Sequence, residues 1–171
     1  KSGKTEFLVR TTAAWGAETV VWFTEEPEVI WEYRINQLPN DLKGQLSHIT
    51  LVYVFGLSHV EIFDQFHADA TKEATVIIID TLSKMWPVDK ENDAGQVDSA
   101  LLPFHEALGE VCAGWLIHHP RKSDGEEATS ARGSGALPAF CDIIMEMRRY
   151  QAGSRADRRR TISGYGRYEE T

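Results

Sequence analysis

Short apolar runs rich in β-branched residues alternate along this chain with longer segments of helical periodicity. The short runs are apolar throughout, which is typical of strands that are buried on both faces. They lie at residues 19–23, 49–55, 74–79 and 113–117. Repeated strand–helix–strand units of this kind predict an α/β fold, with a mostly parallel sheet covered by helices on both faces.

Helices are predicted between these strands and before the first of them. They cover residues 5–15, 27–38, 58–70 and 97–112. Pro27 suits a first helical turn because its missing N–H would have no partner there, and Ser58 with Glu61 has the spacing of a capping box. Polar loops are predicted at 87–95 and 120–130, and residues 141–147 and 161–168 are predicted to pair as C-terminal antiparallel strands.

The length of the chain suits one domain, so residues 1–171 are predicted to form a single α/β unit. The sequence begins with Lys1 in a predicted loop and stops just after a predicted strand. We therefore expect a domain that is truncated at both ends.

The net charge is −8, which argues against nucleic-acid binding over the general surface, because that mode needs many basic side chains. A local basic region stays possible. The arginines gather near the C-terminus, at Arg148, Arg149, Arg155, Arg158, Arg159, Arg160 and Arg167. The two cysteines are far apart in apolar runs, which favours neither a disulfide nor a zinc site and suits the cytoplasm. No apolar stretch approaches the ~20 residues of a membrane helix, so no membrane partner is expected.

The chain opens with the sequence KSGKT, directly before the first predicted helix. Gly3, Lys4 and Thr5 match the end of the phosphate loop G-x-x-x-x-G-K-[ST], in which backbone N–H groups and a helix N-terminus cradle phosphates. Lys4 would reach the β- and γ-phosphates of ATP, and the Thr5 hydroxyl would ligate Mg²⁺. Ser2 and Glu6 flank the triplet and are predicted to contact the nucleotide. A basic N-terminal stub without function is the alternative.

Acidic residues follow two of the predicted strands. Asp80 ends the most apolar strand, which is the Walker B pattern, where the carboxylate holds the Mg²⁺ and its waters. Glu25 and Glu26 follow the strand at 19–23, and an acid at this edge can orient or deprotonate the attacking water. Glu25, the nearer to the strand, is the favoured catalytic residue, and Glu26 suits the charge of a helix start.

Two histidines end the strand at 113–117, and a glycine-rich segment follows the charged loop. Adjacent strand residues point to opposite faces, so His118 and His119 make a poor metal pair. A polar side chain here can instead contact the γ-phosphate, and a structural histidine is the alternative. Arg132 could serve the phosphate of its own subunit, that of a neighbour, or only solvent.

The ordered set of motifs resembles a known family. It consists of GKT, TEEP, VIIIDTLSKM, ENDA, LIHHPRK and ARGSGAL followed by CDIIMEM. This set is similar to the RepA-like branch of RecA-type P-loop ATPases, the hexameric replicative helicases of plasmids, phages and their bacterial relatives. The resemblance covers nearly the whole chain. It implies a RecA-like fold, ATP hydrolysis at subunit interfaces, and DNA held in the central channel of a homo-oligomeric ring.

The resemblance also implies roles for individual residues. By it, Lys4 and Thr5 are the phosphate-loop lysine and hydroxyl, Glu25 is the catalytic glutamate, Asp80 is the Walker B aspartate, and His119 is the sensor histidine with His118 beside it. Two departures matter. The strand and first glycine of the phosphate loop are not in the sequence, and Asp142 stands where some relatives have an arginine finger. The finger candidates are Arg132, Arg148 and Arg149.

Two functions from different classes fit these observations. The first is an ATPase motor that couples hydrolysis to movement on single-stranded DNA, in replication or recombination. The second is a nucleotide-dependent regulatory or scaffold module without unwinding activity, which the acidic net charge mildly favours.

Overall fold

The core of the protein is a four-stranded parallel sheet, seen in a computed structural model that describes residues 3–15, 19–70, 74–109, 112–119, 135–151 and 157–166. The strand order is β2-β1-β3-β4, and every neighbouring pair is parallel. The strands are β1 (Val20–Thr24), β2 (Ile49–Tyr53), β3 (Val76–Asp80) and β4 (Ala113–Ile117). The predicted α/β class and parallel sheet are therefore confirmed.

The two central strands are buried along their whole length, as their unbroken apolar sequences require. Their side chains alternate between two separate hydrophobic clusters. Val21, Phe23, Ile77 and Ile79 point into one cluster. Val20, Trp22, Val76 and Ile78 point into the other. A strand that must be apolar on both faces cannot show the polar alternation of a half-exposed sheet.

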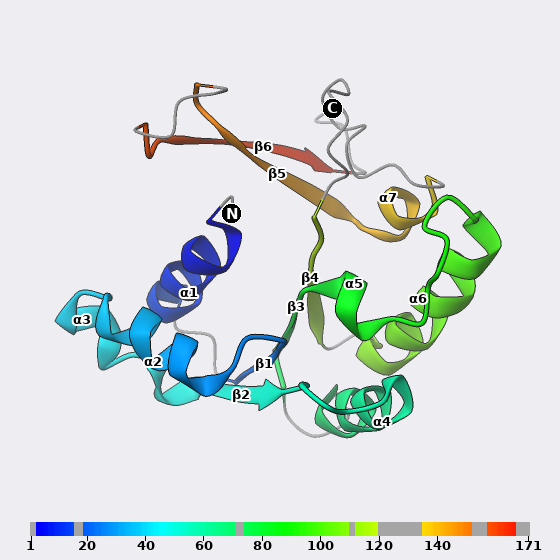
Figure 1. Ribbon diagram of the computed structural model, residues 1–171, viewed down its shortest axis with the longest axis horizontal. Coiled ribbons are helices and arrows are strands. Elements are labelled where there is room, and N and C mark those ends of the chain that lie inside the picture. The colour runs from blue at the N-terminus through cyan, green and yellow to red at the C-terminus, as the bar shows by residue number, and fades with distance from the viewer. Residues whose placement is uncertain are drawn as a thin grey trace.

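Helices cover both faces of the sheet, as predicted (Figure 1). The cluster around Trp22 takes Leu8, Val9, Trp31 and Leu38 from the side of α1 (Lys4–Trp15) and α2 (Glu28–Asn36). The opposite cluster takes residues of α4 (His59–Ala70) and α6 (Ala94–Leu108). Short elements complete the described part: α3 (Asn40–Lys43), the 3-10 helix η1 (Leu46–His48), α5 (Leu82–Met85) and α7 (Ala136–Phe140). None of the helices in this part has the length and apolar character to cross a membrane.

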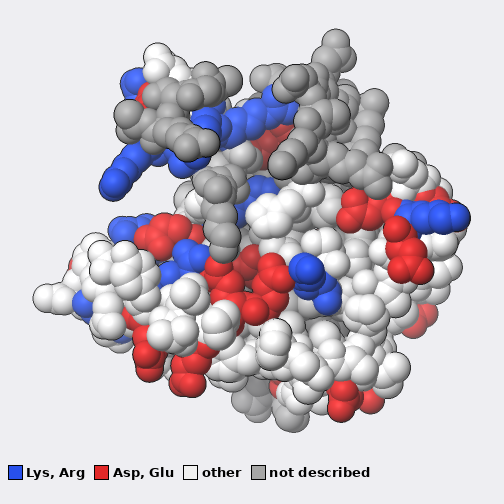
Figure 2. Space-filling view, in the orientation of Figure 1, with Lys and Arg blue, Asp and Glu red and all other residues white. Residues whose placement is uncertain are grey.

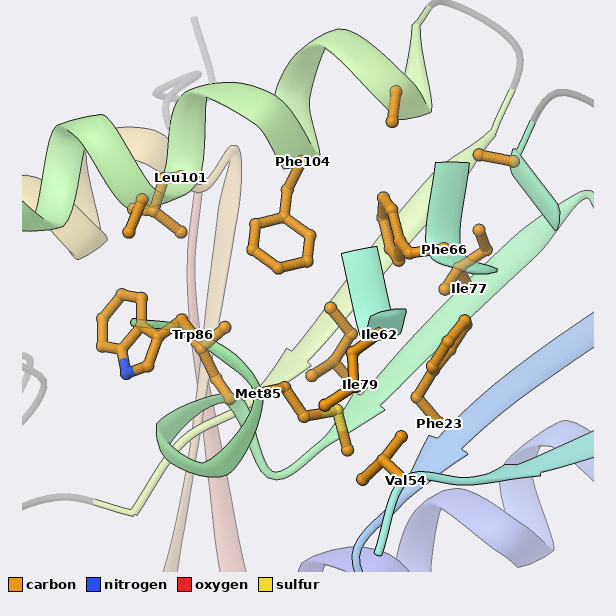
Figure 3. Close-up of a cluster of buried hydrophobic side chains, with 14 of the residues drawn as sticks. Phe23, Val54, Ile62, Phe66, Ile77, Ile79, Met85, Trp86, Leu101 and Phe104 are labelled. Carbon is orange, nitrogen blue, oxygen red and sulfur yellow. The ribbon is translucent and has the colours of Figure 1, made fainter. Parts of the chain in front are cut away.

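Aromatic rings fill the space between β1, α4 and α6 (Figure 3). The ring of Phe66 lies 5.8 Å from that of Phe23 and 4.9 Å from that of Phe104, measured between centroids. Phe66 keeps 1% of its surface. The contact of Phe66 with Phe104 is edge-to-face, and contacts of this kind stabilise a core beyond the area that they bury.

Local signals set the helix boundaries, with some shifts from the predicted ones. Ser58 and Glu61 form the expected capping box, since the Ser58 N–H donates to the Glu61 carboxylate at 2.8 Å and the Glu61 N–H donates to the Ser58 hydroxyl at 3.3 Å. The helix predicted over 97–112 instead spans Ala94–Leu108. Asp93 caps its start through Gly95 N–H, and Gly109, with φ of +56°, ends it.

The predicted C-terminal antiparallel pair is present as a separate two-stranded sheet, β5 (Ile143–Arg149) and β6 (Arg160–Gly166). Ile143 pairs with Gly166, and Arg149 pairs with Arg160. Figure 1 shows this hairpin across from the N-terminus of α1. The predicted loop at 120–130 lies outside the described residues.

Candidate functional site

Polar residues that follow β1, β3 and β4 meet at one edge of the sheet. Thr24 pairs with Asp80 and Asp80 pairs with Ile117, so the three strands end level with one another. The Glu25 N–H donates to the Asp80 carbonyl at 3.1 Å, which continues the ladder by one step. The carboxyl ends of parallel strands are where ligands gather in open α/β sheets, and the predicted acids lie there.

The N-terminus of α1 reaches the same edge. The Thr5 hydroxyl donates to Asp80 Oδ2 at 2.7 Å, and Lys4 Nζ donates to the His118 carbonyl. Gly3 precedes the helix with φ of +87°, a conformation that side-chain-bearing residues rarely adopt. The structure therefore brings Lys4, Thr5 and Asp80 together, as a shared nucleotide site requires.

The charges at this edge are partly removed from water. Burial lowers the pKa of Lys4, and the charges of Asp80 and Glu146 oppose that shift. Burial raises the pKa of Asp80, which the hydrogen bond from Thr5 opposes. Two further carboxylates raise the same pKa, those of Glu26 and Glu25. Figure 2 shows acidic side chains gathered in the middle of this face, with basic ones beside them.

The oxygen atoms of Thr5 and Asp80 fit a magnesium ion. Mg²⁺ takes one or two protein oxygens and fills its remaining positions with phosphate oxygens and waters. A hydroxyl and a carboxylate oxygen lie 2.7 Å apart here, at the N-terminus of a helix. Within the described ranges no group of three or more His, Cys, Asp or Glu side chains could hold a metal ion. A nucleotide-bound magnesium does not need such a group.

The two glutamates after β1 have different surroundings. Glu25 Oε1 accepts from the Thr81 hydroxyl at 3.4 Å, so its carboxylate lies beside the residue that follows Asp80. Glu26 instead forms a bidentate pair with Arg34, at 2.7 to 2.9 Å. The favoured candidate, Glu25, is thus placed toward Thr81, and Glu26 toward α2. Glu26 also lies just before the start of α2, where the helix-start role considered for it stays a prediction.

A pocket of about 470 Å³ adjoins the site between α1 and α2. Its lining is Glu6, Glu25, Glu26, Pro27, Ile30, Tyr33, Arg34 and Gln37. Glu6 accepts from Arg10 Nε at 2.8 Å within α1, and Arg34 Nη1 lies 3.9 Å from its second oxygen. Glu6 therefore belongs to an ionic network at the wall of this pocket.

The two histidines differ in burial, as expected for adjacent residues at the end of a strand, which point to opposite faces. His118 is half-buried, its carbonyl accepts from Lys4, and its ring lies 6.4 Å from that of Trp86. Burial lowers the pKa of His118, which favours the neutral ring. Its buried Nδ1 has no hydrogen-bond partner among the described residues. His119, the predicted sensor, is exposed at the end of the described segment.

Three of the predicted residues are not seen at this edge of the sheet, and two side chains near it were not predicted. Ser2 and Arg132 lie outside the described residues. Arg148 is paired with Glu146 of the same strand at 2.9 Å. Sequence reasoning missed Thr81 and Arg34, and helical spacing could not have found the pair of Glu26 with Arg34, because Glu26 precedes α2, which begins at Glu28.

Comparison with known proteins agrees with this geometry. No curated protein matches the chain in sequence. A solved structure, described as the crystal structure of the RadB recombinase, is similar in fold, with a TM-score of 0.55 and 15% sequence identity over 85% of this chain and 69% of that chain. The family model described as "AAA domain" matches residues 2–125, most of the chain. With a phosphate-loop end and a strand-end carboxylate meeting on a RecA-like sheet, the chain belongs to the AAA domain family of P-loop ATPases.

Proposed function

We propose that the protein binds ATP with Mg²⁺ and hydrolyses it as a DNA-dependent motor. The observation that supports this most is the hydrogen bond of 2.7 Å between the Thr5 hydroxyl and Asp80, with Lys4 from the same helix turn beside it. This arrangement gives a polyanion an ammonium group, a helix N-terminus and two magnesium ligands in one place.

Each side chain has a distinct part in the proposed reaction. Lys4 exchanges its bond to the His118 carbonyl for the β- and γ-phosphates, where its charge stabilises the transition state. Thr5 and Asp80 hold the magnesium, which neutralises phosphate charge when bound. Glu25 orients the attacking water and accepts its proton. His119 is proposed as the sensor of the γ-phosphate, with His118 behind it.

The assembly is proposed to be a homo-oligomeric ring, with a hexamer as the first candidate and single-stranded DNA in its channel. Residues 1–171 are proposed as one RecA-like domain. Among the finger candidates, Arg148 and Arg149 lie on the hairpin that faces α1, and Arg149 is exposed at its end (Figure 1). The RepA-like motif order supports helicase activity, and the RadB likeness supports a role in recombination.

The test is ATP turnover by the full-length protein, with and without single-stranded DNA. We expect Mg²⁺-dependent hydrolysis that DNA stimulates. ATP hydrolysis that does not respond to DNA would contradict the proposed DNA-dependent motor and would still be consistent with an ATPase. In that case the second candidate applies, a nucleotide-dependent regulatory or scaffold module, which the net charge of −8 favours because it limits DNA contacts to a few loops.

A further inference from the structure

Arg34, in the last turn of α2, lies against the acidic turn that follows β1. Its Nε and Nη2 donate to both oxygens of the Glu26 carboxylate at 2.7 to 2.9 Å. The two side chains keep only 17% and 16% of their surface. A bidentate ion pair that is largely shielded from water is stronger and more directional than an ordinary surface ion pair.

Arg34 neutralises the charge of Glu26, which lies close to two other carboxylates, those of Glu25 and Asp80. Glu26 is one residue from Glu25, and its carboxylate acts electrostatically on Asp80, as does the guanidinium of Arg34 with the opposite sign. Three carboxylates therefore share the edge of the sheet where the proposed ATP would add its own negative charge. Like charges that are partly removed from water repel one another and any bound polyanion.

The same helix also fixes the backbone of the acidic turn. The buried Thr24 hydroxyl accepts from Trp31 Nε1 at 3.0 Å and from the Glu26 N–H at 3.1 Å. Trp31 keeps 3% of its surface and packs edge-on against Trp22 of β1, with ring centroids 4.9 Å apart. The position of α2 relative to the strand is thus defined by packing, and α2 carries Arg34 to a defined place.

We propose that Arg34 is a positioning residue for hydrolysis, which draws Glu26 toward α2 and neutralises it, so that Glu25 is the carboxylate presented to the reacting water. The assignment rests on the proposed ATPase function. Arg34 does not touch the nucleotide in this scheme and acts through Glu26. Its contact with Glu6 at 3.9 Å connects the same guanidinium to the helix that carries Lys4 and Thr5.

The experiment is a double-mutant cycle in the full-length protein, with steady-state ATP turnover and binding of a fluorescent ATP analogue as readouts. Arg34→Gln is expected to lower kcat about tenfold or more and to weaken ATP affinity by a smaller factor, because it leaves the charge of Glu26 unneutralised near Glu25 and Asp80. Glu26→Gln is expected to keep kcat within about threefold of the wild type. The double variant is expected to return close to Glu26→Gln, since the charge to be neutralised is gone.

Wild-type turnover is measured first, and its absence refutes the proposed function rather than the role of Arg34. Unchanged kcat in Arg34→Gln, or a double variant as slow as Arg34→Gln, overturns the role of Arg34, because an effect that acts through the Glu26 charge must disappear when that charge is removed. A large loss in Glu26→Gln overturns it as well, since Glu26 would then be the catalytic acid. If Arg34→Gln does not fold, Arg34→Lys replaces it, with an expected partial loss because lysine lacks the planar fork.

Discussion

The central strands of the parallel sheet and the two strands of the C-terminal hairpin differ in how deeply they are buried. All five residues of β3 are buried, and the strand ends in Asp80. By contrast, β5 and β6 contain no buried residue and have exposed arginines near the hairpin turn. Strands covered on both faces hold catalytic side chains in fixed positions. A hairpin exposed on one side can instead present charge to something outside its own fold.

The two regions nevertheless meet at the site. Glu146 of β5 keeps 9% of its side-chain surface, and its charge opposes the lowering of the Lys4 pKa that burial causes. The hairpin therefore brings the charge of Glu146 close enough to act on the phosphate-loop lysine, and it carries exposed arginines, Arg148 and Arg149, at the end of β5. In the proposed ring, the sheet edge would carry the chemistry, and the exposed arginines of the hairpin would be the candidates for contact with a neighbouring subunit.

The largest expected effect tests whether the sheet edge is where chemistry occurs. Lys4→Ala removes the ammonium group that faces Asp80 and should lower ATP turnover by about 10³-fold or more, because the phosphates lose their charge partner in the transition state. Steady-state hydrolysis by the full-length protein measures it. Lys90→Ala is the control, because Lys90 is exposed in the loop before α6. Hydrolysis retained by Lys4→Ala contradicts the phosphate-loop assignment.

The next effect compares the stabilities of the two regions. Phe66→Ala should lower the free energy of unfolding by about 3–5 kcal/mol, because it leaves a cavity between two aromatic rings. Ile162→Ala, at a hairpin residue that keeps 40% of its surface, should cost less than about 1 kcal/mol. Urea denaturation followed by tryptophan fluorescence measures both. Equal losses would show that the hairpin is as tightly packed as the sheet.

Much of this fold could be predicted from the sequence, because apolar runs and capping signals are local. The strand ending in Asp80, the Ser58 capping box and the C-terminal pair were all predictable. The short helices α5 and α7 were not, since one turn of four or five residues has no periodicity to detect. The end of α6 was misplaced because the apolar residues continue to Cys112, beyond the glycine that ends the helix.

The site was predictable where a motif or a strand end fixes the position of a residue, as the phosphate-loop motif does for Lys4 and Thr5. Asp80 and Glu25 directly follow strands, so the parallel register brings them together. Thr81 and Arg34 depend on side-chain rotamers and on the packing of α2, which no local pattern encodes. The sequence favoured Glu25 only because it is nearer to the strand, and the ion pair of Glu26 with Arg34 could not be read from any local pattern.

A smaller effect separates the two glutamates at the sheet edge. Glu25→Gln keeps the shape of the side chain and removes its capacity to accept a proton, so kcat should fall about 10²-fold while the ATP analogue still binds. Single-turnover hydrolysis and analogue binding measure the two quantities. Loss of binding together with turnover would point to a structural part for Glu25. The matched change at Glu26 provides the comparison.

The smallest effect tests the hairpin as a source of contacts between subunits. Arg149→Ala should lower turnover about tenfold with little change in ATP binding, because an arginine that reaches a neighbour's γ-phosphate stabilises the transition state rather than the binding of ATP to its own subunit. Mixing Arg149→Ala with Lys4→Ala subunits should then restore part of the activity. Some interfaces in the mixture combine an intact Lys4 from one subunit with an intact Arg149 from its neighbour. A mixture no more active than the sum of its parts would place Arg149 outside the neighbour's site.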